Sequence, residues 1–323
     1  MKINWETPSR PGSVAYGEIS FSNSRLEKSK FPAIEISGSL PGRKLCVMAG
    51  IHVNEASSIE AAIELHRVVD PKRMRGKISI IPIVNVSTVP NRTVETPEDG
   101  KNLHWLFPGS PEGSYSECLA DALLSEWAVG ADVLLDLHGG DRGENLCDYV
   151  VFQKTEDEVW NDKCRRLAAC FDTELAVGLS PKGLESTGRC CTGLAGQRRI
   201  ALVCESGANG ILDRKNIEWH REGIVNVARH LGIYDDGVDA KEYAQISLDE
   251  YEFIASPLDG MIYPIVEAGT RIERGDVFAE IRDSYGRKKT SIRARVGGIV
   301  MMRTTLQFVE KAEIVGSIAY SSR

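Results

Sequence analysis

Three short apolar segments, separated by stretches with helical periodicity, place the strongest constraint on the fold of this chain. The segments are KLCVMAG (residues 44–50), DVLLDLH (132–138) and IALVCE (200–205). Short apolar runs of this kind are typical of buried strands. The predicted helices cover residues 55–69, 116–129 and 216–231. Strands that alternate with helices predict an α/β sandwich.

A further strand and a long irregular segment follow the first predicted helix. Residues Lys77–Val84 (KISIIPIV) form an apolar run, and Pro82 inside it indicates an edge or the end of a strand. Residues 85–115 are rich in Pro, Gly, Asn and charge. Irregular segments of this length are usually functional or disordered. Either interpretation is open for this loop.

The sequence pattern changes after Tyr234 and predicts two domains. A polar linker, DDGVDAKEYAQ, is followed by short strands that alternate with Gly and Asp-Gly turns. This pattern is typical of a small antiparallel β-barrel. We predict a catalytic domain over residues 1–240 and a small C-terminal β-barrel domain, similar to a barrel-sandwich, over 241–323.

Charge and hydropathy limit the classes of partner. The chain has 323 residues and a net charge of −7, and its basic residues do not alternate with aromatic ones in a cluster. No apolar run approaches the ~20 residues that cross a bilayer. We expect a small-molecule or peptide substrate and neither nucleic acid nor a membrane as partner. No signal peptide is recognisable, so a cytoplasmic location is expected. The sequence is also compatible with a homo-oligomer.

The candidate metal ligands are two histidines and one glutamate. His52 and Glu55 lie three residues apart where a predicted strand gives way to a helix, and His138 ends the second apolar segment. The eight cysteines include no CxxC pair, so cysteine is not the expected ligand. Catalytic zinc sites commonly use two histidines and one glutamate, with a fourth position open to water. We predict one Zn²⁺ per chain at these three residues.

Glu205 is the candidate catalytic base because it ends the third apolar segment. Open α/β sheets bind ligands at the carboxyl ends of their strands, where His138 and Glu205 would both lie. Hydrolysis at a metal still needs a base that takes a proton from water and passes it to the leaving nitrogen. Each residue alone has an ordinary explanation as a surface or structural side chain. Together, at separate strand ends of one sheet, they favour a hydrolytic metal site.

Several motifs resemble those of the succinylglutamate desuccinylase/aspartoacylase family, which is related to the zinc carboxypeptidases. The matching segments, in the family's order, are AGIHVNEASSIEAA, NLHWLFPG, DVLLDLHGG and VCESG. The resemblance implies a three-layer αβα carboxypeptidase-like domain with a mixed sheet. It also implies a C-terminal β domain that narrows the catalytic mouth. The implied activity is hydrolysis of an N-acyl bond, with one zinc on His52, Glu55 and His138 and with Glu205 as general base and acid.

The chain departs from the family in its substrate-binding motif. The family's DLNR segment binds a substrate carboxylate, whereas this chain has Asn102-Leu103-His104-Trp105 and lacks the arginine. Indole offers one N–H donor and cannot replace a guanidinium fork. We still expect Asn102, His104 and Trp105 to contact substrate, although Trp105 is equally explained by packing. Arg92 is a candidate to stabilise the oxyanion, although an exposed loop arginine is the simpler interpretation.

Three other functions are compatible with the sequence. A zinc carboxypeptidase would use the same metal site, although the absent arginine weakens this alternative. A non-catalytic metabolite-binding relative would explain the changed substrate motif but not the retained ligands and base. A lipoyl or biotin carrier in residues 246–323 is disfavoured, because the lysines of the RDSYGRKK hairpin lack the usual sequence around a modified lysine.

Overall fold

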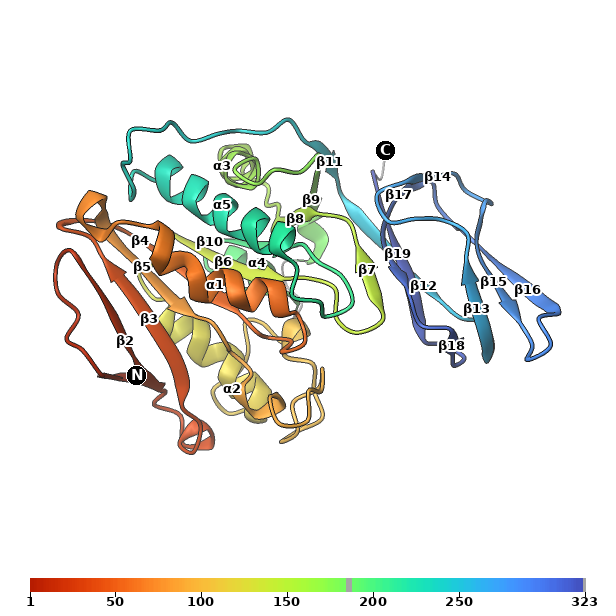
Figure 1. The fold of residues 1–323 in the computed structure, drawn as a ribbon, viewed down its shortest axis with the longest axis horizontal. Coiled ribbons are helices and arrows are strands. Elements are labelled where there is room, and N and C mark those ends of the chain that lie inside the picture. Colours follow the sequence, from red (N-terminus) through yellow and green to blue (C-terminus); the bar gives the residue numbers. More distant parts are fainter. Residues whose placement is uncertain (184–187, 322–323) are drawn as a thin grey trace.

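A ten-stranded mixed sheet forms the centre of the molecule (Figure 1). The structure is a computed structural model that describes residues 1–183 and 188–321. The strand order is β1-β2-β3-β5-β4-β6-β10-β8-β9-β11. The bounds are β1 Lys2–Trp5, β2 Ser13–Ser20, β3 Phe31–Ser37, β4 Leu40–Ala49, β5 Arg75–Ile81, β6 Val133–His138, β8 Tyr149–Gln153, β9 Leu175–Leu179, β10 Ile200–Glu205 and β11 Ile246–Leu248.

The three apolar segments of the sequence become three neighbouring strands at the centre of this sheet. Strand β6 pairs in parallel with β4 on one side and with β10 on the other. Strand β5 pairs in parallel with β4, and strands β3, β2 and β1 extend the sheet beyond β5 by antiparallel pairing. On the other side, β8 pairs antiparallel with β10. The prediction of an α/β fold with a mixed sheet is confirmed.

Helices cover both faces of the sheet (Figure 1). Helices α1 (Ala56–Val68), α3 (Glu158–Ala168) and α5 (Arg214–His230) pack on one face, and α2 (Tyr115–Ala122) and α4 (Cys190–Gly196) pack on the other. Successive residues of β4 alternate between the two cores, because side chains of a strand point to opposite faces. Within the described part of the chain, no helix combines the length and apolar character needed to span a bilayer.

Two predicted elements differ in extent from the observed ones. The helix predicted over residues 116–129 is divided, with α2 ending at Ala122 and a π-helical turn at Leu123–Trp127. Strand β5 ends at Ile81, directly before Pro82, which has no N–H to donate to a neighbouring strand. The 85–115 segment is largely irregular, as expected. The short 3-10 turns of the chain are Ser24–Leu26, Pro71–Arg73, Val86–Thr88, Leu103–Trp105 and Pro181–Gly183.

The C-terminal strands form two sheets, and the predicted closed barrel is not confirmed. One sheet has the order β12-β19-β17-β14, with β7 (Glu144–Leu146) also paired to β17, and the other has the order β16-β15-β13-β18. Strands β14 and β18 are only two residues long, so backbone pairing ends there instead of continuing around a barrel. The bounds are β12 Glu250–Ala255, β13 Gly260–Pro264, β14 Arg271–Ile272, β15 Val277–Arg282, β16 Lys288–Arg293, β17 Gly298–Thr304, β18 Phe308–Val309 and β19 Ile314–Tyr320.

Backbone pairing connects the C-terminal strands to the rest of the chain. Strand β11 still belongs to the large sheet through its pairing with β9, and the C-terminal sheets begin with β12 at Glu250. In the opposite direction, β7 leaves the large α/β unit and pairs with β17 (Figure 1). The division at residue 240 remains a prediction. The pairing of β7 brings the C-terminal sheet to the end of the strands that carry the candidate site.

Candidate active site

The three predicted metal ligands meet at the carboxyl ends of β4 and β6. His138 is the last residue of β6, His52 follows β4, and Glu55 is the N-cap of α1. The Nδ1 atom of His52 lies 2.7 Å from Oε1 of Glu55, and Nδ1 of His138 lies 3.0 Å from Oε2. One ligand atom of each residue lies within 4.8 Å of the other two. The three side chains can therefore contact one shared ion.

Two glycines allow this convergence. Gly50 has a positive φ of 66° directly after β4, a conformation that lets the chain turn toward His52. A Cβ on Gly139 would lie 2.4 Å from the carbonyl oxygen of Ser206, so only glycine lets the ends of β6 and β10 approach this closely. The Gly139 N–H also donates to Glu55 Oε2 at 3.1 Å. The backbone after His138 thus helps to hold the candidate carboxylate ligand.

The outer nitrogens of both histidines face oxygen atoms. The Nε2 atom of His52 lies 3.0 Å from Oδ1 of Asn102, and Nε2 of His138 lies 3.2 Å from Oδ1 of Asp136. Because each Nδ1 faces Glu55, each Nε2 is the nitrogen left to donate outward. Metal-binding histidines typically donate their second N–H to a carboxylate or carbonyl oxygen. The contact of His52 with Asn102 is such a hydrogen bond, whereas Asp136 faces His138 at ion-pair distance without hydrogen-bond geometry.

The charges of His52, Glu55 and His138 favour a positive charge beside the Glu55 carboxylate. Burial alone would raise the pKa of Glu55, but the imidazoles of His138 and His52 lower it to about 2. Burial alone would lower the pKa of His138, but the carboxylates of Asp136 and Glu55 raise it well above its usual value. A buried carboxylate that attracts positive charge from two imidazoles is a suitable environment for a cation.

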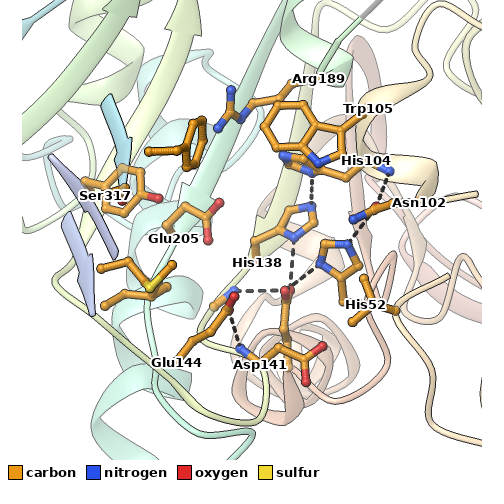
Figure 2. Close-up of a pocket in the computed structure, with 17 residues that line it drawn as sticks. His52, Asn102, His104, Trp105, His138, Asp141, Glu144, Arg189, Glu205 and Ser317 are labelled. Atoms are coloured by element: carbon orange, nitrogen blue, oxygen red, sulfur yellow. Dashed lines mark hydrogen bonds and ion pairs between the residues drawn. The ribbon is translucent and has the colours of Figure 1, made fainter. Parts of the chain in front are cut away.

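Glu205 faces the same pocket from the end of β10. Its backbone pairs in register with His138, and its side chain is 8% exposed. Figure 2 shows its carboxylate directed toward the space beside His138. Burial raises the pKa of Glu205 to about 7. A carboxylate with this pKa can take up and release a proton near neutral pH.

Three of the four predicted substrate residues line the pocket. These residues lie at the 3-10 turn Leu103–Trp105 of the 85–115 segment, beside His52 and His138 (Figure 2). They are Asn102, which is the N-cap of the turn, His104 and Trp105. The Nδ1 atom of His104 lies 3.3 Å from Nε2 of His138, and burial lowers the pKa of His104 well below its usual value. The ring of Trp105 meets that of His104 edge-on.

Arg92, the fourth predicted substrate residue, does not line the pocket. Its side chain is exposed and its backbone has a positive φ of 53°. Its carbonyl oxygen accepts a hydrogen bond from the Asn54 side chain at 3.0 Å, so Arg92 supports the loop through its backbone.

Arg189 is a pocket residue that the sequence did not identify. It is the N-cap of α4, and its guanidinium carbon lies 4.4 Å from the ring centroid of Trp105 and 5.2 Å from that of Tyr251. Trp105 occupies the motif position where the family has arginine, so a guanidinium from another element stacks on the replacing indole. No local motif around Arg189 signals this placement.

The C-terminal sheet forms one wall of the pocket. Phe253 of β12, Met302 of β17 and Ser317 of β19 line it. Tyr149, at the start of β8, and Glu144, at the start of β7, complete this side. The C-terminal strands thus border the pocket, and the expectation that they narrow a catalytic mouth remains a prediction.

Comparisons with known proteins find relatives over most of the chain. The family model described as the succinylglutamate desuccinylase/aspartoacylase catalytic domain matches residues 41–231. The N-alpha-acetyl-L-2,4-diaminobutyric acid deacetylase of Halomonas elongata is 24% identical over 283 residues, which cover 86% of this chain and 82% of that protein.

Solved structures share the fold over nearly the full length. The product-bound ectoine utilization protein of Ruegeria pomeroyi matches with a TM-score of 0.84 and 21% identity, covering 99% of both chains. A succinylglutamate desuccinylase from Silicibacter sp. TM1040 matches with a TM-score of 0.82 and 21% identity, again over 99% of both chains.

Proposed function

Because this chain belongs to the succinylglutamate desuccinylase/aspartoacylase family, we propose that it hydrolyses the amide bond of a small N-acylated amino acid. The Halomonas relative is named as a deacetylase of such a compound, an N-acetylated diamino acid. The observation that carries the proposal is the meeting of His52, Glu55 and His138 in a pocket that Glu205 also faces.

We propose that one zinc ion is held by His52, Glu55 and His138. Two imidazole nitrogens and a carboxylate are a ligand set that zinc takes in catalytic sites. The oxygens of Asn102 and Asp136 beside the outer histidine nitrogens support this assignment, because they fix the ring orientation that presents Nδ1 to the ion. Bound there, zinc supplies Lewis-acid activation of water and of the amide carbonyl.

Glu205 is the proposed general base and acid. Strand β10 holds its side chain in the pocket, and no described residue forms a hydrogen bond or ion pair with its carboxylate (Figure 2). The carboxylate is therefore free to accept a proton from the attacking water. It then delivers that proton to the leaving amide nitrogen, which allows the carbon–nitrogen bond to break.

The substrate is proposed to be anchored by residues on the loop side of the pocket. Arg189 provides a guanidinium that can pair with the substrate carboxylate, and Trp105 supports it by stacking. Asn102 and His104 provide polar atoms close to the histidine ligands. Because Arg92 lies outside the pocket lining, we assign it no contact with substrate. The C-terminal wall favours a small acylated amino acid over a peptide.

Zinc content and hydrolysis, measured together in the wild type and in Glu205→Gln, test this proposal. Glu205→Gln should keep stoichiometric zinc, because Glu205 is not a proposed ligand. Its kcat on N-acetyl amino acids should fall by about 10² to 10⁴, the usual contribution of a positioned acid–base group. Glu112→Gln, an exposed change outside the pocket, is the matched control. Turnover retained in Glu205→Gln, or zinc-loaded wild type that cleaves peptides but no N-acyl amino acid, would contradict the proposal.

A further inference from the structure

The pocket holds more carboxylates than the proposed reaction uses. One guanidinium, that of Arg189, is present among its described lining residues. A divalent ion and this guanidinium would together bring three positive charges, one fewer than the four negative charges that the carboxylates carry when Glu205 is deprotonated and ready to accept a proton. The lining carboxylates are those of Glu55, Asp141, Glu144 and Glu205. A substrate carboxylate at Arg189 would increase the excess of negative charge.

Glu144 is fixed at the edge of the pocket by backbone contacts. Its Oε2 accepts the N–H of Asp141 at 3.0 Å, and its own N–H donates to the carbonyl oxygen of Asp141 at 3.0 Å. Its carbonyl oxygen accepts the N–H of Asn209 at 2.7 Å, and its backbone pairs with Thr304 of β17. Figure 2 shows its carboxylate beside the backbone of Asp141, on the same side of the pocket as Glu205. One carboxylate oxygen is therefore held by the backbone, and the other remains for a ligand.

Within residues 1–183 and 188–321, neither Glu144 nor Asp141 forms an ion pair with a lysine, arginine or histidine. Asp141 is 7% exposed, and its Oδ2 atom has no hydrogen-bond partner in this described part. Glu205, 8% exposed, also directs into the pocket a carboxylate that is unpaired among the described residues. Buried carboxylates without a cation are costly, so this side of the pocket is complementary to a positively charged ligand group.

We propose that Glu144, supported by Asp141, binds a primary ammonium group of the substrate. The inference rests on the proposed function and specifies its substrate class, which is an N-acylated amino acid whose side chain ends in an amine. The ammonium group donates to the free oxygen of Glu144, while the substrate carboxylate pairs with Arg189. An ammonium group has three donors and no acceptor, so the acceptor oxygens of Glu144 and Asp141 are suitable partners for it.

Matched substrate pairs test this specificity. The amine-bearing members are Nα-acetyl-diaminobutyrate, Nα-acetylornithine and Nα-acetyllysine, and the neutral members of similar length are Nα-acetyl-aminobutyrate, Nα-acetylnorvaline and Nα-acetylnorleucine. The wild type should prefer the amine-bearing member of at least one pair by about tenfold or more in kcat/KM, as expected for a hydrogen bond to a charged group.

Glu144→Gln should abolish most of this preference, mainly through KM. The amide oxygen of glutamine can still accept the Asp141 N–H, so the turn is kept. Glu112→Gln removes one negative charge outside the pocket and should leave the preference unchanged. Equal kcat/KM within every pair in the wild type would overturn the inference. A preference that survives Glu144→Gln would overturn it equally.

Calorimetric binding of ornithine and norvaline separates this inference from the proposed hydrolysis. If the protein hydrolyses no N-acyl amino acid, the proposed function fails. The ammonium site is still supported if ornithine binds at least about tenfold more tightly than norvaline and Glu144→Gln removes the difference. Binding that does not distinguish the two amino acids overturns the ammonium site, whether or not hydrolysis is observed.

Discussion

Replacing Asp136 by asparagine should weaken metal binding without changing a proposed ligand. Asp136 is completely buried, and its Oδ1 lies 3.2 Å from Nε2 of His138. Its two carboxylate oxygens have no hydrogen-bond partner that meets ordinary geometry among the described residues. The interaction of this buried carboxylate with His138 is therefore its main polar contact. Asparagine has nearly the same size but removes the negative charge that faces Nε2 of His138.

The expected loss of zinc affinity in Asp136→Asn follows from the contact of Asp136 with a proposed ligand, His138. Loss of the outer partner of a metal-binding histidine typically lowers metal affinity about 10- to 100-fold. This corresponds to about 1.4 to 2.8 kcal/mol of binding free energy. Without metal, the change should be less harmful to folding, because replacing a buried carboxylate by a neutral amide also removes its desolvation cost. Zinc affinity should fall more than the thermal stability of the metal-free protein.

Competition with a chromophoric zinc chelator measures the affinity, and thermal unfolding of the metal-free proteins measures stability. Asp162→Asn is the matched control, because Asp162 is exposed on α3 far along the chain from the site. Zinc affinity of Asp136→Asn equal to that of the wild type would refute the reasoning. An equal loss in Asp162→Asn would show that the effect does not come from the contact with His138.

Two further changes test the pocket. Gly139→Ala should lower the free energy of unfolding by about 1 to 3 kcal/mol, because its Cβ would lie 2.4 Å from the Ser206 carbonyl oxygen. Chemical denaturation should show a smaller loss for Gly188→Ala, whose Cβ would lie 3.5 Å from its nearest neighbour. Equal losses in the two variants would contradict the steric explanation. Arg189→Met should raise KM for N-acyl amino acids by roughly 10- to 100-fold through loss of a charge-assisted contact. The KM for their carboxamide analogues should change little. An equal effect on both substrate types in steady-state kinetics would show that Arg189 does not bind the carboxylate.

The sequence allowed the central strands and the cluster of candidate ligands to be predicted. The segments that end near His52, His138 and Glu205 are apolar because β4, β6 and β10 are buried on both faces of the sheet. Parallel neighbours present their carboxyl ends at one edge, so residues far apart in sequence meet there. The apolar segments were therefore sufficient to predict that His52, His138 and Glu205 lie close together.

Other parts of the site depend on contacts that local patterns do not specify. Arg189 enters the pocket from the start of the short helix α4, where neither periodicity nor a motif distinguishes it from a surface arginine. Glu144 is placed by the pairing of β7 with β17, which joins residues far apart in the chain. The barrel prediction was not confirmed for a similar reason, since turn spacing predicts short strands but not which of them pair.

Anomalous diffraction from crystals of the zinc-loaded protein, recorded on both sides of the zinc absorption edge, would locate the metal and identify its ligands. We expect one zinc peak per chain, about 2.0 to 2.2 Å from Nδ1 of His52, Nδ1 of His138 and a carboxylate oxygen of Glu55. Glu205 should lie beside the ion without binding it. A pocket with no anomalous peak, or a zinc ion bound by other residues, would contradict the account.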